Sequence, residues 1–124
     1  MENVAVLDRL VAAYNSDHAE GVVAEGADDV EYLIPDRGVH LVGREQWLGL
    51  VKSFARSVPG RRMTVVSLIV SGDLAALEWV IEGTSSGHVP GFPPADEPFR
   101  REGCSVIRFH EGRIVRWRDY LDHS

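Results

Sequence analysis

The chain has 124 residues, of which 44% are hydrophobic and 26% charged, and 13 basic against 19 acidic residues give a formal net charge of −6. The length and composition fit one globular domain over residues 1–124, and the negative net charge argues against a nucleic-acid partner. The sequence contains no apolar run near the ~20 residues that cross a bilayer. Because the N-terminus lacks the layout of a secretion signal and Cys104 is the single cysteine, we expect a cytoplasmic protein without a disulfide or a membrane partner.

The first half of the chain predicts three helices and one short strand. Apolar residues at three- and four-residue spacing predict a first helix, which starts at an Asn3 N-cap and ends near Asn15, with its stripe at Val4, Leu7, Leu10, Val11 and Tyr14. A short second helix is expected over residues 17–25, and a brief strand over residues 30–34. Gly43 opens the third helix, whose apolar face carries Trp47, Leu50, Val51, Phe54 and Val58.

After residue 60 the hydrophobic period changes from that of a helix to that of a strand. Strands are expected over residues 63–71, 74–84, 100–109 and 114–122. A turn at Gly72 separates the first two, a proline-bearing loop precedes the third, and a three-residue hairpin loop with a left-handed Gly112 joins the last two. Helices followed by an antiparallel meander predict an α+β domain, and a strongly bent sheet around the helices would enclose a pocket.

The last predicted strand places one carboxylate on an apolar face. Strand alternation and the hairpin put Asp119 together with Val115, Trp117, Leu121, Ser105, Ile107 and Phe109. An unpaired buried charge is expensive, so Asp119 must find a partner, bind water or raise its pKa. A carboxyl with a raised pKa in an apolar pocket suits general acid–base catalysis. The alternative is a structural Asp119 that accepts hydrogen bonds from backbone N–H groups or from an arginine.

Three tryptophans accompany this carboxylate. Trp79 and Trp117 are expected on the interior face with Asp119, and Trp47 on the apolar face of its helix. They would either line a pocket for a flat, hydrophobic ligand or form ordinary core.

The five histidines do not form a recognisable metal motif. No two have the i, i+4 spacing of a helical ligand pair, and none stands beside the cysteine, so we expect no metal site. His40 and His88 are the two that could reach a pocket mouth as a second polar group.

The stretch from Phe109 to Asp122 resembles the closing hairpin of SnoaL-like proteins, in the NTF2-like superfamily. Residues 11–15 are similar to the family's first helix, Gly43-Arg-Glu-Gln-Trp to the start of its third, and residues 82–94 to the segment before its crossing loop. The resemblance implies an NTF2-like cone, a cystatin-like α+β barrel in which three N-terminal helices pack against a curved antiparallel sheet. It also implies a homodimer.

The resemblance assigns a role to one residue in particular. In the polyketide cyclases of this group an Asp on the last strand is the acid–base of an intramolecular aldol closure, and Asp119 matches that position. The histidine of the family's G-T-H-x-G stretch is Ser85 here. Limonene epoxide hydrolase shares the motif around residue 119, but its other two catalytic groups fall at Trp79 and Ile81. The base of ketosteroid isomerase falls at Ile34.

Three hypotheses follow. The first is a SnoaL-like enzyme without a cofactor, in which Asp119 acts as general acid and base on a small hydrophobic molecule, for cyclisation, isomerisation or hydration. The second is a non-catalytic NTF2-like module for ligand binding or dimerisation. The third is an epoxide hydrolase, for which Glu31, Asp36 and Arg37 would have to fold inward.

The expected pocket provides a way to choose between these hypotheses. Its lining is predicted to comprise Tyr14, Trp47, Trp79, Ile81, Ile107, Trp117 and Leu121. A raised pKa of Asp119 beside an open cavity would favour the enzyme. A carboxylate held by an arginine in a filled interior would favour the module.

Overall fold

The computed structural model describes residues 2–87 and 93–122, which contain three α-helices, one short 3-10 helix and six strands. The helices are α1 (Glu2–Asn15), α2 (Ala19–Val23), η1 (Pro35–Arg37) and α3 (Arg44–Ser57). The strands are β1 (Gly26–Ile34), β2 (Val39–Val42), β3 (Arg62–Ser71), β4 (Leu74–Thr84), β5 (Pro98–His110) and β6 (Arg113–Leu121). Within the described residues, no helix has both the length and the apolar content that crossing a bilayer requires.

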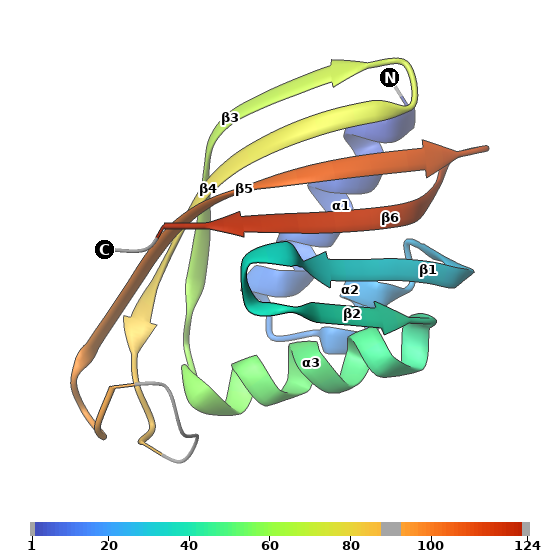
Figure 1. Cartoon of the computed structure of the whole chain (residues 1–124). Coiled ribbons are helices and arrows are strands. Elements are labelled where there is room, and N and C mark those ends of the chain that lie inside the picture. Colours follow the sequence, from blue (N-terminus) through green and yellow to red (C-terminus); the bar gives the residue numbers. More distant parts are fainter. Residues whose placement is uncertain (1, 88–92, 123–124) are drawn as a thin grey trace.

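The strands form one curved sheet in the order β2-β1-β6-β5-β4-β3, with the helices on its concave side (Figure 1). Neighbouring strands are antiparallel except β1 and β6, which run parallel. The resemblance implied an antiparallel sheet, but the sheet is mixed, because the early strand β1 pairs in parallel with the last strand of the chain. The resemblance also implied three N-terminal helices, but α3 follows β1 and β2, in agreement with the strand that the sequence predicts over residues 30–34.

Helix α1 turns one apolar stripe toward the core, made of Val6, Leu7, Leu10 and Tyr14. Val6 replaces the expected Val4 in this stripe. Asn3 is not an N-cap, because the helix already includes the residue before it, and its side-chain amide instead donates a 2.9 Å hydrogen bond to the turn between β3 and β4. At the other end of α1, the Asn15 amide exchanges two hydrogen bonds with the backbone of Met63, at 3.0 and 2.7 Å, which fixes the helix against β3.

Helix α3 runs beside β2 and covers one end of the concave face (Figure 1). Gly43 directly precedes α3 and has a φ of 91°, a backbone conformation that favours glycine. This conformation lets the chain turn directly from β2 into the helix. Trp47 and Val51 are buried on its inner side, and Phe54 packs partly buried beside them. The predicted start and apolar face of this helix are both present.

The β5–β6 hairpin sets which side chains of β6 face inward. Its turn consists of two residues, Glu111 and Gly112, rather than the expected three. Both have left-handed backbone conformations, with φ angles of 50° and 78°. An irregularity in the ladder next to the turn shifts the alternation locally, so Ile114 rather than Val115 is fully buried. Beyond that point the alternation follows the expected pattern, which places Asp119 inside.

Candidate active site

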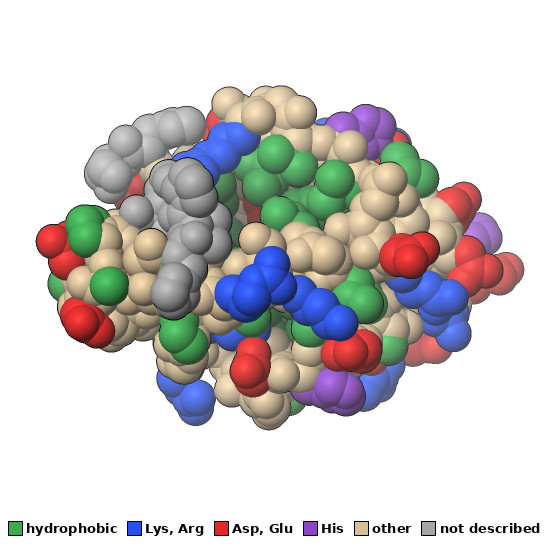
Figure 2. Space-filling model, turned by 90° about the horizontal axis from the view of Figure 1, so that it is seen from below, with side chains coloured by type: hydrophobic (Ala, Val, Ile, Leu, Met, Phe, Trp, Pro, Cys, Tyr) green, Lys and Arg blue, Asp and Glu red, His purple; other side chains and the backbone are tan. Residues whose placement is uncertain are grey.

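The concave face of the sheet and the helices enclose a cavity of about 280 Å³. Figure 2 shows a hollow lined by apolar side chains at the end of the molecule where α3 lies, with basic side chains beside it. Six of the seven residues predicted as pocket lining do line the cavity: Tyr14, Trp47, Trp79, Ile81, Trp117 and Leu121. The seventh, Ile107, does not, because it lies nearer the hairpin and is packed completely into the core.

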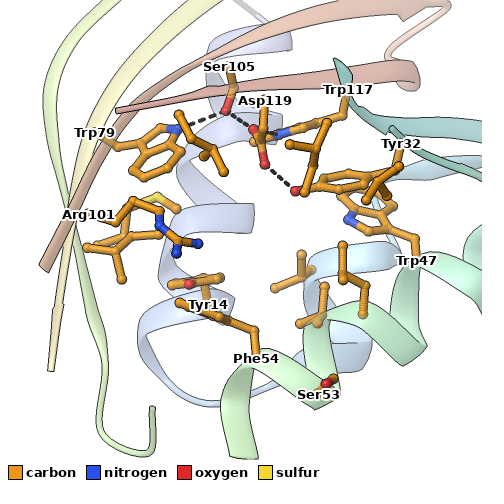
Figure 3. Close-up of a pocket in the computed structure, with 18 of the residues that line it drawn as sticks. Tyr14, Tyr32, Trp47, Ser53, Phe54, Trp79, Arg101, Ser105, Trp117 and Asp119 are labelled. Carbon is orange, nitrogen blue, oxygen red and sulfur yellow. Dashed lines mark hydrogen bonds between the residues drawn. The ribbon is translucent and has the colours of Figure 1, made fainter. Parts of the chain in front are cut away.

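Asp119 points from β6 into this cavity and is 8% exposed (Figure 3). Three neutral side chains donate hydrogen bonds to its carboxylate. The Ser105 hydroxyl reaches Oδ1 at 2.5 Å, the Trp117 indole N–H reaches Oδ1 at 2.6 Å, and the Tyr32 hydroxyl reaches Oδ2. Burial raises the pKa of Asp119, and these hydrogen bonds, which favour the charged form, offset part of that rise.

The hydrogen bonds distinguish the two carboxylate oxygens of Asp119. The Trp79 indole N–H donates to the Ser105 oxygen at 2.8 Å, which leaves the Ser105 hydrogen for Oδ1 of Asp119. The Trp117 indole N–H can only donate, so Oδ1 is held as an acceptor from two sides. Oδ2 faces the Tyr32 hydroxyl, which can donate or accept. A proton carried by Asp119 therefore belongs on Oδ2.

Tyr32 is the principal site residue that sequence reasoning missed. Its ring is buried on β1 and stacks on Trp47, with 6.0 Å between ring centroids. Burial, followed by the charge of Asp119, raises the pKa of Tyr32 well above its ordinary value, so its hydroxyl stays protonated. Strand alternation with Val30 marks Tyr32 as inward-facing. The alternation of one strand does not, however, reveal the parallel ladder that sets Tyr32 opposite Trp117.

Two arginines, Arg101 from β5 and Arg37 from η1, also line the cavity. Arg101 is half-buried, its guanidinium points into the cavity (Figure 3), and the guanidinium carbon lies 5.0 Å from the ring centroid of Phe99. Burial, together with the nearby charge of Arg37, lowers the pKa of Arg101. The β5 alternation could have found Arg101, since it has the same parity as Ser105. Arg37, which the epoxide hydrolase hypothesis required to fold inward, does line the cavity, although it lies outside the strands and no alternation marks it.

Two histidines, His40 and His88, were expected at the pocket mouth as a second polar group. His40 does not line the cavity: its ring nitrogen lies 2.8 Å from Glu31, to which Arg116 also donates a hydrogen bond at 3.4 Å. His88 lies outside the described residues. Among the described residues that line the cavity, Asp119 is the only carboxylate, so the second carboxylate needed by the epoxide hydrolase hypothesis is not supplied by Glu31 or Asp36. Within the same described ranges, no three His, Cys, Asp or Glu side chains converge as metal ligands would.

Comparison with known proteins shows the family to which this chain belongs. The family model of SnoaL-like polyketide cyclases matches residues 4–124. The chain belongs to this family. The resemblance inferred from the stretch between Phe109 and Asp122 is thereby confirmed. A search of curated proteins finds no match.

Several solved structures share the fold of this chain at low sequence identity. AclR from Streptomyces galilaeus superposes with a TM-score of 0.85 at 21% identity, over 98% of this chain and 89% of that one. An NTF2-like protein from Burkholderia pseudomallei gives a TM-score of 0.83 at 20% identity, over 98% and 92% of the two chains. TerC, co-crystallised with polyporic acid, gives a TM-score of 0.82 at 17% identity, again over 98% and 92%. The protein therefore has an α+β fold of the NTF2-like type.

Proposed function

We propose that this protein is an enzyme in which Asp119 acts as general acid and base on a small, flat, hydrophobic substrate. The observation that carries the proposal is a single buried carboxyl, with a raised pKa, that points into a cavity lined by aromatic side chains. A raised pKa makes such a carboxylate a stronger base than an ordinary aspartate, which suits proton exchange with a substrate carbon or oxygen. Membership of the polyketide cyclase family favours cyclisation over isomerisation or hydration.

The proposed reaction moves one proton between the substrate and Asp119. Ionised Oδ2 removes a proton from a carbon next to a substrate carbonyl, and the resulting carbanion attacks a second carbonyl carbon of the same molecule. The alkoxide formed by ring closure then takes the proton back from Oδ2. Throughout, Ser105 and Trp117 hold Oδ1, while the Tyr32 hydroxyl turns from donor to acceptor when Oδ2 is protonated.

The walls of the cavity suit a flat ligand. The Trp47 ring centroid lies 6.0 Å from that of Tyr32 and 6.0 Å from that of Trp117, which makes one continuous aromatic surface beside the carboxyl. Aromatic walls with a few placed polar groups are typical of small-molecule sites. The co-crystal of the similarly folded TerC with polyporic acid supports a small-molecule site in this fold.

Deuterium exchange into 2-tetralone, a flat bicyclic ketone with an acidic α-carbon, tests the proposal. The wild-type protein is expected to accelerate exchange in D₂O, as followed by proton NMR. Asp119→Asn should abolish the protein-dependent rate, and Tyr32→Phe should lower it by about tenfold, since general acid–base contributions are of the order of 10²–10⁴ in total. The matched control is Glu82→Gln, which removes an exposed carboxyl of β4 and should leave the rate unchanged.

Binding measurements separate catalysis from mere ligand capture. Calorimetry should show that Asp119→Asn still binds 2-tetralone, and thermal melting should show that the variant is folded. Exchange by Asp119→Asn at the wild-type rate would show that the acid–base assignment is wrong. Tight binding by wild-type protein without any accelerated exchange would instead support the non-catalytic binding module.

The expected homodimer belongs to the same proposal. Large apolar side chains remain exposed on β3 and β6, with Val66 at 60%, Ile69 at 67% and Tyr120 at 38% exposure. Covering them in a second subunit would bury apolar area that a single chain leaves in water. Light scattering should give twice the mass of the chain for wild type and a smaller mass for Ile69→Lys; a monomeric wild type would contradict the dimer.

A further inference from the structure

The cavity has a charge that differs in sign from that of the whole chain. The chain carries a net charge of −6. Among the described residues that line the cavity, by contrast, Arg37 and Arg101 are basic and Asp119 is the only acidic one. Burial further favours the neutral form of that acid. The cavity therefore concentrates positive charge in an otherwise acidic protein.

The basic and acidic groups enter the cavity from different positions along the sheet, and the charge of Arg101 is still close enough to lower the pKa of Asp119. Arg101 and Ser105 lie four residues apart on the inner face of β5, a separation of about 14 Å between their Cα atoms at ~3.4 Å per residue. Ser105 hydrogen-bonds Asp119, whereas the Arg101 guanidinium projects into the cavity above Tyr14 (Figure 3). A flat ligand that contacts both sites must therefore have two distinct ends.

The arrangement of the two arginines favours an anion. Arg101 is half-buried, and its guanidinium carbon lies over the Phe99 ring at 5.0 Å from the ring centroid. Arg37 is exposed and adds a second positive charge close enough to affect Arg101. Two like charges beside an apolar wall repel each other, and an anionic oxygen group between them would relieve that repulsion. A guanidinium also binds such a group through two parallel N–H donors.

We propose that Arg101, assisted by Arg37 at the cavity mouth, binds an anionic oxygen group of the substrate and so determines which end of it reaches Asp119. The substrate is then a flat hydrophobic molecule that carries a carboxylate or an acidic enol at the end remote from the reacting carbon. Only this orientation relative to Asp119 rests on the proposed function. Anion binding itself is a property of the cavity.

A pair of probes that differ only in charge tests the anion site. By calorimetry at low salt and neutral pH, wild-type protein is expected to bind 2-naphthoate about tenfold more tightly than neutral 2-naphthamide, as one charge-assisted contact predicts. Arg101→Gln should weaken naphthoate binding by about tenfold and leave naphthamide binding within about twofold. Arg101→Lys should lie between wild type and Arg101→Gln, because it keeps the charge and loses the planar fork.

Two further variants locate the effect. Arg37→Gln should reduce the preference less than Arg101→Gln, because water and salt screen an exposed charge. Arg108→Gln removes an exposed arginine from the outer face of the same strand β5 and should change neither affinity. Circular dichroism and thermal melting verify that each variant is folded.

The outcomes separate this inference from the proposed function. Equal affinities of wild-type protein for the two probes, absence of binding of both, or an equal loss for both probes in Arg101→Gln would overturn it. Asp119→Asn should keep the preference for naphthoate. If Asp119→Asn exchanges deuterium normally while the preference persists, only the acid–base assignment fails. If the preference is absent while exchange depends on Asp119, only the anion site fails.

Discussion

Glu31 and Asp119 belong to neighbouring strands of one sheet, β1 and β6, yet face opposite sides of it. Glu31 lies opposite Arg116 in the parallel ladder, with a side chain 33% exposed, and its hydrogen-bond partners are His40 and Arg116. The hydrogen bond from His40, followed by that from Arg116, lowers the pKa of Glu31. Asp119 has only neutral donors among its hydrogen-bond partners, and burial raises its pKa.

The difference shows how one sheet gives two carboxyl groups pKa shifts of opposite direction. The hydrogen bonds from His40 and Arg116 favour the charged form of Glu31 and so lower its pKa. Hydroxyl and indole donors hold the Asp119 carboxylate in place without adding a positive charge, so the group can still accept a proton. The charge of Arg101, which also lines the cavity, lowers the pKa of Asp119 less than the three neutral hydrogen bonds do.

The two faces should differ most in what they contribute to stability. Leu77 on β4 is fully buried, whereas its neighbour Glu78 faces outward and hydrogen-bonds Ser67 at 2.6 Å. Leu77→Ala is expected to lower the free energy of unfolding by about 2–5 kcal/mol, and Glu78→Ala to change it by only about 0.5 kcal/mol. Urea denaturation of the two variants beside wild type measures the contrast. Losses of similar size would mean that the concave face does not hold the main core.

Removing one donor should test the hydrogen-bond network of the concave face. Tyr32→Phe deletes the hydroxyl that reaches Asp119, so the free energy of unfolding at neutral pH should fall by about 1–3 kcal/mol. The pKa of Asp119 should rise further, since a hydrogen bond that favours its charged form is lost. Carbon-13 NMR titration of the Asp119 carboxyl measures this shift. Tyr120→Phe, on the outer face, is the control, and a fall in the pKa of Asp119 in Tyr32→Phe would contradict the network.

Local patterns predicted the elements that rest on local sequence. The expected strand over residues 74–84 agrees with β4, because a turn at Gly72 and alternating residues define it without reference to the rest of the chain. The inward orientation of Asp119 was likewise predictable, since a hairpin fixes the register of its two strands. Alternation alone also contained the information that Arg101 shares the inner face with Ser105.

Contacts between distant segments could not be predicted in this way. Tyr32 reaches Asp119 through the parallel ladder of β1 with β6, and the side chains of one strand do not reveal its partner. The sequence analysis allowed His40 to reach a pocket mouth, but β2 pairs with β1 so that the His40 ring meets Glu31 on the outer face. The bulge that buries Ile114 instead of Val115 depends on how the hairpin turn closes, which composition does not specify.

The pH dependence of stability should isolate the effect of burial on Asp119. In the unfolded chain its pKa returns to the ordinary value of 3.8, below that of the native state. The native state therefore binds more protons between these two values, so this group's contribution lowers the free energy of unfolding as pH rises through that window. Asp119→Asn lacks the contribution. Urea denaturation at several pH values should show wild-type stability falling relative to the variant as pH rises, and a relative increase would contradict the raised pKa.

The outer face should give the smallest effect, with the opposite sign. Because His40 and Arg116 lower the pKa of Glu31, its contribution to stability is present above its ordinary pKa of 4.5 and is lost as pH falls through the native value. Glu31→Gln is expected to cost at most about 1 kcal/mol at neutral pH, because exposed ion pairs are weak, and high salt should reduce the loss further. Urea denaturation at low and high salt measures both. A loss that is larger than that of Tyr32→Phe, or insensitive to salt, would mean that Glu31 is not the solvated counterpart of Asp119, and the contrast between the two faces would then rest on Asp119 alone.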